Sequence, residues 1–267
     1  MSKKLILSSD GIFPIIKDAN GEFIKRDLKT NLSTAGTVQG EGKYIGEPSL
    51  FIRLAGCNLK CKWTSEDGFV SECDTSYANE ETENNTSLEV EDIIKIIKNN
   101  IGSIKHIVIT GGEPLLQKEA LIDLCYQIKK QFNLIITIES NSSISPKGFE
   151  GLVDLFSISP KLNNAVLRTT GRMPEYCVQE YIDMARNGDT DLQIKFVVSK
   201  TSDDDLIKAF LSDYTSYKQS DIMVMPAGTN MEQLNKTSKT ALEISIKNGW
   251  RFTHRLHIIL FGDERAV

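Results

Sequence analysis

The chain has 267 residues, of which 40% are hydrophobic and 25% charged, a composition ordinary for a soluble globular protein with a sizeable core. Lys and Arg number 31 against 36 Asp and Glu, and this net charge of −5 argues against a nucleic-acid backbone as the main partner. No apolar run approaches the ~18 residues that span a bilayer, and the N-terminus lacks the apolar stretch of a signal peptide. We therefore expect a cytoplasmic protein.

The first part of the chain is predicted to be largely irregular. Residues 1–30 alternate short apolar runs with turn residues, which indicates a small, hairpin-like N-terminal extension. Residues 31–48 are rich in Gly and polar side chains and predict a loop, and residues 49–55, SLFIRLA, predict a strand. No repeat or linker marks a domain boundary, so residues 1–267 are expected to form one domain.

After residue 85 the chain alternates helices with strands. Residues 86–100 are predicted to be a helix with a capping box of Thr86 and Glu89 and a core face of Val90, Ile93, Ile94 and Ile97. Further helices are expected at 117–131, 174–186, 203–213 and 231–248, and strands at 106–110, 134–140, 153–159, 192–199, 221–226 and 251–260. This alternation predicts a parallel sheet covered by helices, either doubly wound or a barrel, with ligands at the carboxyl ends of the strands.

Three of the five cysteines form a candidate metal site. They are spaced Cys57-x3-Cys61-x11-Cys73, whereas Cys125 and Cys177 fall on core stripes of predicted helices and are expected to pack. Thiolates suit zinc, copper(I) or iron–sulfur clusters, and a structural zinc site normally has four protein ligands. Because no fourth Cys or His lies near in sequence, a 4Fe–4S cluster with one open iron is a leading interpretation. A zinc site completed by a distant histidine and three ordinary loop cysteines are the alternatives.

Two neighbouring features bear on this choice. Without residues 64–72 the cysteines read CxxxCxxC, with Trp63 two residues after the second. This nine-residue insert is polar and predicts an exposed bulge, which costs little loop entropy. After the predicted strand 106–110 come Gly111-Gly112-Glu113-Pro114, whose glycines allow close backbone approach and whose carboxylate suits an ammonium group. A tight βα turn explains the glycines alone, but their combination with the cysteines is a much stronger signal.

This combination resembles the radical S-adenosylmethionine (SAM) superfamily. Further segments resemble one family within it, the 7-carboxy-7-deazaguanine synthases. They are TVQGEGKYIGEP (37–48), FIRLAGCN (51–58), Cys73-Asp74-Thr75, TIESNSSI (137–144), SISPKL (157–162) and the ending RLHIILFGDERAV (255–267). The resemblance covers residues ~31–267, nearly the whole chain.

The resemblance implies an α/β fold, a partial, distorted (β/α) barrel of about six parallel strands. It implies a lyase that contracts 6-carboxy-5,6,7,8-tetrahydropterin to 7-carboxy-7-deazaguanine with loss of ammonia, a precursor of queuosine and other 7-deazapurines. The implied cofactors are a 4Fe–4S cluster, Mg²⁺ and SAM, which is cleaved to a 5′-deoxyadenosyl radical and then re-formed. A homodimer reduced by a flavodoxin- or ferredoxin-type protein is also implied.

The resemblance assigns residues to three groups. The cluster ligands are Cys57, Cys61 and Cys73, and the Mg²⁺ ligand is Thr75. The SAM contacts are Trp63, Asp74, Gly111, Gly112, Glu113, Ser159, Pro160, Lys161, Met225 and Pro226. The substrate contacts are Val38, Gln39, Gly40, Glu41, Arg53, Thr110, His257 on the predicted last strand, and Val267 through its carboxylate. The chemistry is consistent, because Gln and Glu pair with amide and amino edges and Arg binds anionic oxygens.

Two other functions stay open from the sequence alone. A glycyl-radical activating enzyme has the cluster and the GGEP segment, but does not need Gln39-Gly40-Glu41 or the RLH ending. A zinc-binding protein without redox chemistry would contain zinc and no iron or sulfide. The polarity of residues 64–72 further suggests that this insert faces a partner reductase.

Overall fold

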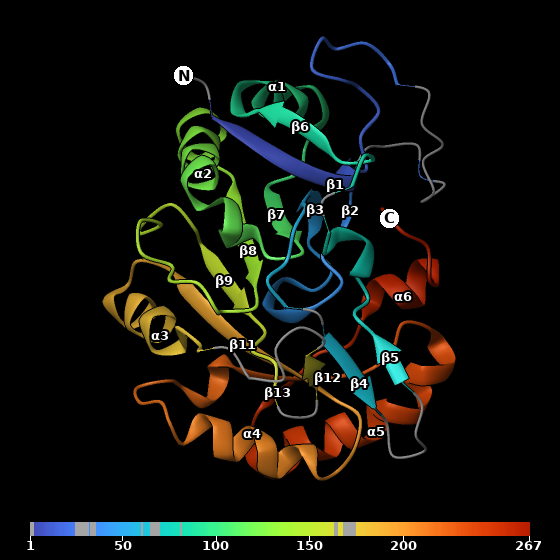
Figure 1. Ribbon diagram of the computed structural model, residues 1–267, viewed down its shortest axis with the longest axis vertical. Helices are drawn as coiled ribbons and strands as arrows, with labels where there is room; N and C mark the ends of the chain where they lie inside the picture. The colour runs from blue at the N-terminus through green and yellow to red at the C-terminus, as the bar shows by residue number, and fades with distance from the viewer. Residues whose placement is uncertain are drawn as a thin grey trace.

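The computed structural model describes residues 3–24, 32, 36–59, 61–64, 70–80, 82–162, 165–167 and 175–267. Its main sheet has the strand order β13-β12-β11-β9-β8-β7-β3-β1-β6, and β2 pairs with β3 (Figure 1). These strands are β1 (Lys4–Phe13), β2 (Thr37–Val38), β3 (Pro48–Leu54), β6 (Thr86–Glu89), β7 (His106–Gly111), β8 (Ile135–Ser140), β9 (Leu155–Ile158), β11 (Asp191–Val198), β12 (Ile222–Pro226) and β13 (Arg251–Phe252).

The parallel part of this sheet has the topology of an open barrel. From β3 through β7, β8, β9, β11 and β12 to β13, each strand pairs in parallel with the next strand of this series. A doubly wound sheet reverses its strand order at a switch point, whereas a barrel always adds strands on the same side. Within the described residues no ladder joins β13 to the opposite edge, so the barrel is partial. The predicted fold class is confirmed.

Six α-helices accompany the sheet in the described residues, and all but the last contribute buried side chains to the main core. They are α1 (Val90–Asn100), α2 (Lys118–Phe132), α3 (Val178–Asn187), α4 (Asp203–Leu211), α5 (Met231–Asn248) and α6 (Leu256–Phe261). Each of the first five lies close to a predicted range. The predicted core face of α1 is buried, as is the stripe of Leu121, Leu124, Cys125 and Ile128 on α2. Helical periodicity therefore located the buried faces correctly.

The N-terminal segment differs from its prediction. Residues 4–13 form one long strand inside the main sheet, between β3 and β6. In the described part of this segment, the bridge of Lys17 to Phe23 resembles a hairpin. The capping box was wrong as well, because residues 86–89 are strand β6, paired to β1, and Glu89 at the N-cap makes no side-chain cap bond. The backbone groups of β1 need a partner on this side, and β6 supplies it.

The predicted last strand, 251–260, was also wrong beyond its first two residues. The Thr253 N–H still bonds to the Val224 carbonyl (3.0 Å), but Thr253 Oγ1 accepts from the Gly42 N–H (2.7 Å). The Leu256 N–H then donates to the Gly40 carbonyl (2.8 Å), and α6 begins. Bonding to the loop around Gly40 therefore replaces sheet pairing, and His257 lies on a helix.

The insert in the cysteine loop is not a simple bulge. Strand β5 (Val70–Glu72) pairs antiparallel with β4 (Cys61–Thr64), which pairs antiparallel with β10 (Ala165–Leu167). The insert thus contributes its described ends to a second, three-stranded sheet. Residues 65–69 of the insert lie outside the described residues, as does the side chain of Trp63.

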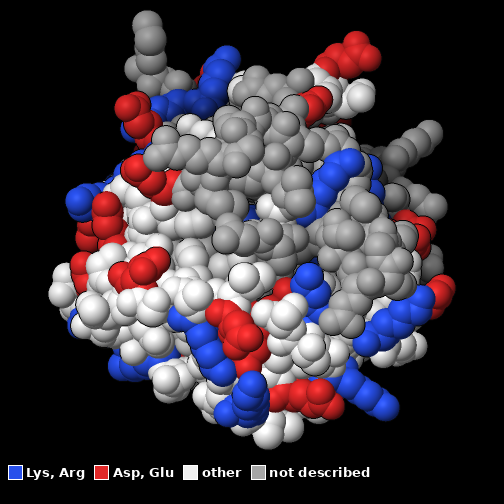
Figure 2. Space-filling model, turned by 60° about the horizontal axis from the view of Figure 1, so that its bottom comes forward, with Lys and Arg blue, Asp and Glu red and all other residues white. Residues whose placement is uncertain are grey.

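The surface carries charges of both signs. Figure 2 shows Lys and Arg interspersed with Asp and Glu over the described part of the face in view. This arrangement agrees with the small negative net charge of −5 and offers a polyanion no continuous basic surface there. Within the described residues, no helix combines the length and the apolar character that crossing a membrane requires.

A buried histidine network lies at the amino-terminal end of the barrel. His106 is fully buried, with Nδ1 2.7 Å from Ser49 Oγ and Nε2 2.8 Å from Thr137 Oγ1. Because Ser49 donates its hydroxyl proton to the Glu47 carbonyl, it must accept from Nδ1–H, and Nε2 then accepts from Thr137. Burial lowers the pKa of His106 to about 4. The folded protein therefore holds this imidazole neutral.

We predict that His106 makes folding stability fall as the pH drops below its ordinary pKa of 6.5. The unfolded chain takes up a proton there while the folded chain does not, which removes about 1.4 kcal/mol between pH 8 and 5.5. Urea unfolding of the parent, His106→Gln and the control His254→Gln at both pH values measures this term. Only His106→Gln should lose it, and an equal pH dependence in all three proteins contradicts the prediction.

Candidate active site

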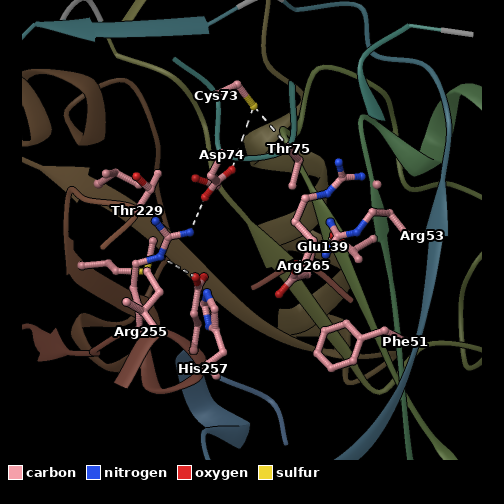
Figure 3. Close-up of a pocket in the computed structure, with 18 of the residues that line it drawn as sticks. Phe51, Arg53, Cys73, Asp74, Thr75, Glu139, Thr229, Arg255, His257 and Arg265 are labelled. Carbon is pink, nitrogen blue, oxygen red and sulfur yellow. Dashed lines mark hydrogen bonds and ion pairs between the residues drawn. The ribbon is translucent and has the colours of Figure 1, made fainter. Parts of the chain in front are cut away.

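A cavity of about 330 Å³ opens among residues from the carboxyl ends of the parallel strands (Figure 3). It brings together most of the predicted site residues. They are Val38, Gln39, Gly40, Glu41, Arg53, Cys57, Cys61, Cys73, Asp74, Thr75, Thr110, Gly111, Gly112, Ser159, Lys161, Met225, His257 and Val267. Among the predicted residues with described side chains, Glu113, Pro160 and Pro226 do not line it.

The three clustered cysteines line the same cavity as free thiols. Cys57 and Cys61 pack around Leu59, and Cys73 Sγ lies 3.4 Å from Thr75 Oγ1. Burial raises the pKa of Cys57 to about 12 and that of Cys61 to about 11, and the neighbouring thiols add to this effect. Within the described residues they do not form a ready coordination shell. The donor set nevertheless fits an iron–sulfur cluster, since buried thiolates need a soft cationic partner.

The Gly111-Gly112 segment is held by the carboxylate that follows it. Glu113 is fully buried and accepts hydrogen bonds from the Leu115 N–H (3.0 Å), the Asn141 N–H (2.7 Å) and Ser140 Oγ (3.0 Å). It therefore ties the end of β7 to the end of β8. Burial raises the pKa of Glu113, and these donors oppose the rise. In this geometry the carboxylate positions the two glycines, which themselves line the cavity.

Both glycines are required by close backbone packing. A Cβ on Gly111, whose φ is +151°, would lie 2.2 Å from the Leu54 carbonyl oxygen, and a Cβ on Gly112 would lie 2.2 Å from that of Gly56. The turn after β7 can therefore press against the end of β3 only without side chains. This packing brings the Gly111-Gly112 backbone to the same cavity as Cys57.

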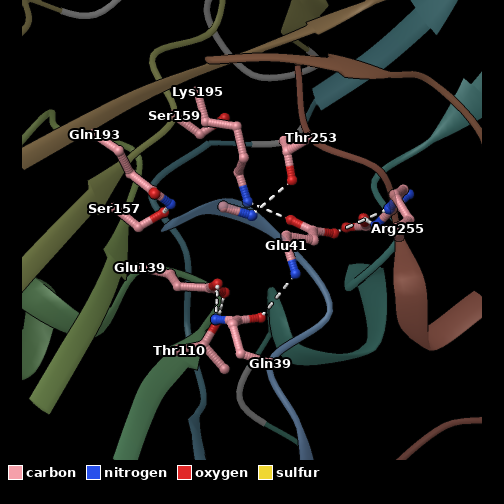
Figure 4. Close-up of polar contacts among 12 residues, drawn as sticks. Gln39, Glu41, Thr110, Glu139, Ser157, Ser159, Gln193, Lys195, Thr253 and Arg255 are labelled. Carbon is pink, nitrogen blue, oxygen red and sulfur yellow. Dashed lines mark hydrogen bonds and ion pairs between the residues drawn. The ribbon is translucent and has the colours of Figure 1, made fainter. Parts of the chain in front are cut away.

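Four buried or half-buried charges alternate in sign along one wall. Lys195 bonds to Glu41 Oε2, and Arg255 Nε donates to Glu41 Oε1 (3.0 Å; Figure 4). Another nitrogen of Arg255 bonds to Asp74 Oδ2 (Figure 3). Burial alone raises the pKa of Glu41, but the charges of Lys195 and Arg255 outweigh it and hold this pKa well below its usual range. We call this row, Lys195–Glu41–Arg255–Asp74, the charge chain.

The Glu139 carboxylate also lines the cavity. Glu139 Oε1 accepts from Gln39 Nε2 (3.2 Å), and its Oε2 accepts from Thr110 Oγ1 (2.9 Å). His257 lies against Gly40, where a Cβ would come within 2.2 Å of His257 Nδ1. Burial lowers the pKa of His257, while the Glu41 charge opposes this, so the ring favours its neutral form. A neutral imidazole can both donate and accept a proton.

Two arginines occupy another side of the cavity. Arg265 donates to Asp10 Oδ1 (2.8 Å) and lies 3.3 Å above the centre of the Tyr77 ring, while Arg53 Nε is 3.6 Å from Asp10 Oδ2. Both arginines line the cavity in Figure 3. Arg53 also lies 5.3 Å from the ring centre of Phe13. Asp10 balances only one of these two guanidinium charges, and a guanidinium group can bind an anionic group of a ligand.

Sequence reasoning missed five charged residues whose contacts shape the site. They are Asp10, Glu139, Lys195, Arg255 and Arg265. A charged residue inside the apolar strand 192–199 was a usable signal for Lys195, as was the position of Glu139 near the end of its strand. The Asp10–Arg265 pair joins residues 255 positions apart, and no local pattern marks it.

Known proteins resemble this chain over most of its length. Residues 51–192, just over half of the chain, match the family model of the radical SAM superfamily. The 7-carboxy-7-deazaguanine synthase of Halobacterium salinarum is 32% identical, over 85% of this chain and 88% of its own. That of Rhodopirellula baltica is 30% identical, over 86% and 85%. The crystal structure of QueE from Escherichia coli has a TM-score of 0.63 at 22% identity, covers 92% of this chain and 95% of its own, and shows a common fold.

We predict that Glu113→Gln destabilises the protein. The new amide group would face backbone N–H donors that now meet carboxylate oxygens, at a cost of about 2 kcal/mol in the free energy of unfolding. Urea unfolding of the full chain measures this cost, with Glu243→Gln on the exposed face of α5 as the control. A variant as stable as the control would mean that Glu113 does not hold the turn.

Proposed function

The chain belongs to the radical SAM superfamily and, within it, to the 7-carboxy-7-deazaguanine synthase family, and from this premise we propose that it converts 6-carboxy-5,6,7,8-tetrahydropterin to 7-carboxy-7-deazaguanine. The observation that carries the proposal is one cavity lined by Cys57, Cys61 and Cys73 together with the Gln39–Glu41 loop and Gly111-Gly112. A glycyl-radical activating enzyme has no need of that loop. The product would serve queuosine or another 7-deazapurine.

The residues at one end of the cavity suit the cluster and SAM. We propose that Cys57, Cys61 and Cys73 hold a 4Fe–4S cluster and that the backbone of Gly111-Gly112 receives the amino end of SAM. The further proposed SAM contacts are Trp63, Asp74, Ser159, Lys161 and Met225. Glu113, Pro160 and Pro226 do not line the cavity, and we propose that they act through the turns and strand ends that carry them. When bound, the cluster and SAM supply one-electron chemistry that removes a hydrogen atom from the substrate.

The opposite side of the cavity suits a pterin. The amino and ring N–H groups of a pterin are hydrogen-bond donors. Glu139, which is held by Gln39 and Thr110, presents carboxylate oxygens that can accept from them. The backbone of residues 38–40 offers further polar groups. Neutral His257 can hold or pass a proton at its ring nitrogens. We propose that these groups orient the ring and that Val267 lines the same region.

The substrate carboxylate is proposed to bind between Arg53 and Arg265. Asp10 compensates one of the two charges and leaves one positive charge for the ligand. Thr75 is the proposed Mg²⁺ ligand, because its hydroxyl lies at the cavity beside Cys73 and Mg²⁺ needs few protein oxygens. Substrate oxygens and water would complete the coordination.

The proposal also covers the domain organisation, the oligomeric state, the location and the electron donor of the enzyme. We propose that residues 1–267 act as one catalytic domain, as a homodimer in the cytoplasm. A flavodoxin- or ferredoxin-type protein is the proposed electron donor, since the reaction needs one electron at the cluster. The proposal that residues 64–72 face this donor rests on their polarity.

We predict that the reconstituted protein, incubated anaerobically with SAM, Mg²⁺, dithionite and the carboxypterin, forms 7-carboxy-7-deazaguanine in excess over SAM consumed. Mass spectrometry measures both, and omission of Mg²⁺ should slow product formation. Cys73→Ala should abolish SAM cleavage. SAM cleavage without the deazaguanine would remove this substrate, and zinc without iron or sulfide in anaerobically isolated protein would favour the zinc-binding alternative.

We predict that Arg265→Gln raises the KM for the carboxypterin at least about tenfold with a smaller effect on kcat, because one charge-assisted contact is lost. Arg251→Gln, on exposed β13, is the control. Tetrahydropterin without the carboxylate, used as a competitive inhibitor, should bind parent and variant alike. If the variant bound both ligands equally more weakly than the parent, Arg265 would not be the residue that recognises the carboxylate.

A further inference from the structure

We propose that Arg255 is a positioning residue that fixes the cysteine loop, the Gln39–Glu41 loop and the loop after β12 relative to one another. Each of these loops carries groups that line the cavity. This role is separate from the chemical reaction. It rests on the proposed function only in taking Cys73 as a cluster ligand and Glu41 as a substrate contact.

The guanidinium of Arg255 reaches all three loops at once. Nε donates to Glu41 Oε1 (3.0 Å; Figure 4), and one terminal nitrogen donates to the Gly228 carbonyl. The other terminal nitrogen donates to Asp74 Oδ2 (Figure 3). Arg255 is only 7% exposed. Because its five N–H donors lie in one rigid plane, three bonds in three directions fix the three acceptors relative to one another.

The Gln39–Glu41 loop is attached to the same segment by its backbone. The Leu256 N–H donates to the Gly40 carbonyl (2.8 Å), and the Gly42 N–H donates to Thr253 Oγ1 (2.7 Å). With the Arg255–Glu41 pair, residues 253–256 hold this loop at three points. The loop is therefore well fixed even without Arg255.

The cysteine loop depends more on Arg255. Backbone bonds from Gly56 to Ala78 and from Cys57 to Asn79 hold its end against β3. For residues 73–75, Ser76 and Ala78 supply bonds within the same turn. The ion pair of Asp74 with Arg255 ties this turn to the far wall of the cavity. Loss of Arg255 should therefore release Cys73 more than Cys57 or Cys61.

Electrostatics make the role specific to arginine. Arg255 separates the carboxylates of Glu41 and Asp74. Without it Asp74 would lose this cation and Glu41 would keep Lys195 alone, which makes the burial of both carboxylates more costly. A lysine would keep the charge, but a single ammonium group cannot make three planar bonds to three loops. Arg255→Lys should consequently preserve part of the effect, and Arg255→Gln none of it.

The experiment measures thiol reactivity, which does not depend on turnover. The full chain, before cluster reconstitution, is treated with a maleimide, and mass spectrometry follows Cys57, Cys61 and Cys73 separately. In Arg255→Gln we expect Cys73 to react about tenfold faster than in the parent, as a locally opened loop would, with Cys57 and Cys61 changed less than about twofold. Arg255→Lys should fall in between. Arg186→Gln, which breaks the pair between Arg186 on α3 and Asp221 before β12, is the matched control.

A double-variant cycle tests the contact itself. Asp74→Asn should accelerate the maleimide reaction of Cys73 in the parent. It should add little in Arg255→Gln, because both changes break the same ion pair. The Asp74 side chain is 42% exposed, so this variant keeps the test valid if Arg255→Gln does not fold. The proposal would be overturned if the maleimide reaction rate of Cys73 did not change or if all three thiols were accelerated equally. The same pattern of rates in Arg186→Gln would also overturn it.

Turnover separates this inference from the proposed function. In the reconstituted enzyme, Arg255→Gln should release more 5′-deoxyadenosine per product molecule and lose iron to a chelator faster than the parent. If the parent does not convert the pterin, the proposed function fails, while thiol reactivity and iron release still decide the role of Arg255.

Discussion

The charge chain Lys195–Glu41–Arg255–Asp74 is the interaction on which the arrangement of the cavity depends. Charged groups are costly to bury, and these four are tolerated because each carboxylate meets at least one cation and the total charge is zero. The row runs from β11 through the Gln39–Glu41 loop and the start of α6 to the cysteine loop. Elements that the barrel leaves apart are joined there.

The open barrel explains why such a chain is needed. In a closed barrel, ladder hydrogen bonds fix both edges of the sheet, but within the described residues β13 has no partner on its outer side. Side-chain and backbone bonds from Gly40, Glu41 and Gly42 to residues 253–256 fill this role instead. The same bonds end the last strand after Phe252 and turn the chain into α6. The same hydrogen bonds therefore both end the predicted strand early and hold the loop that lines the site.

Local pattern and tertiary pairing can be separated at particular residues. The buried faces of α1 and α2 were predictable, because a 3.6-residue period places the apolar side chains on one face of a helix, and that face packs against the core. The extended conformation of residues 86–89 was not, because Thr86 and Glu89 suit a capping box equally well and only the presence of β1 decides. Glu113 was predicted as a ligand-facing carboxylate, but its three hydrogen bonds face the protein, and donors from β8 become visible only in the folded chain.

The sequence by itself determined the class of fold, the family and the chemical groups of the site, since strand–helix alternation, cysteine spacing and the glycine turn are local patterns. Only the tertiary structure decided which charges meet. Asp10 with Arg265, and Glu41 with Lys195 and Arg255, lie up to 255 positions apart, and their pairing results from which strands become neighbours. Pairing energies of this kind depend on distance and burial, and neither is written in the order of residues along the chain.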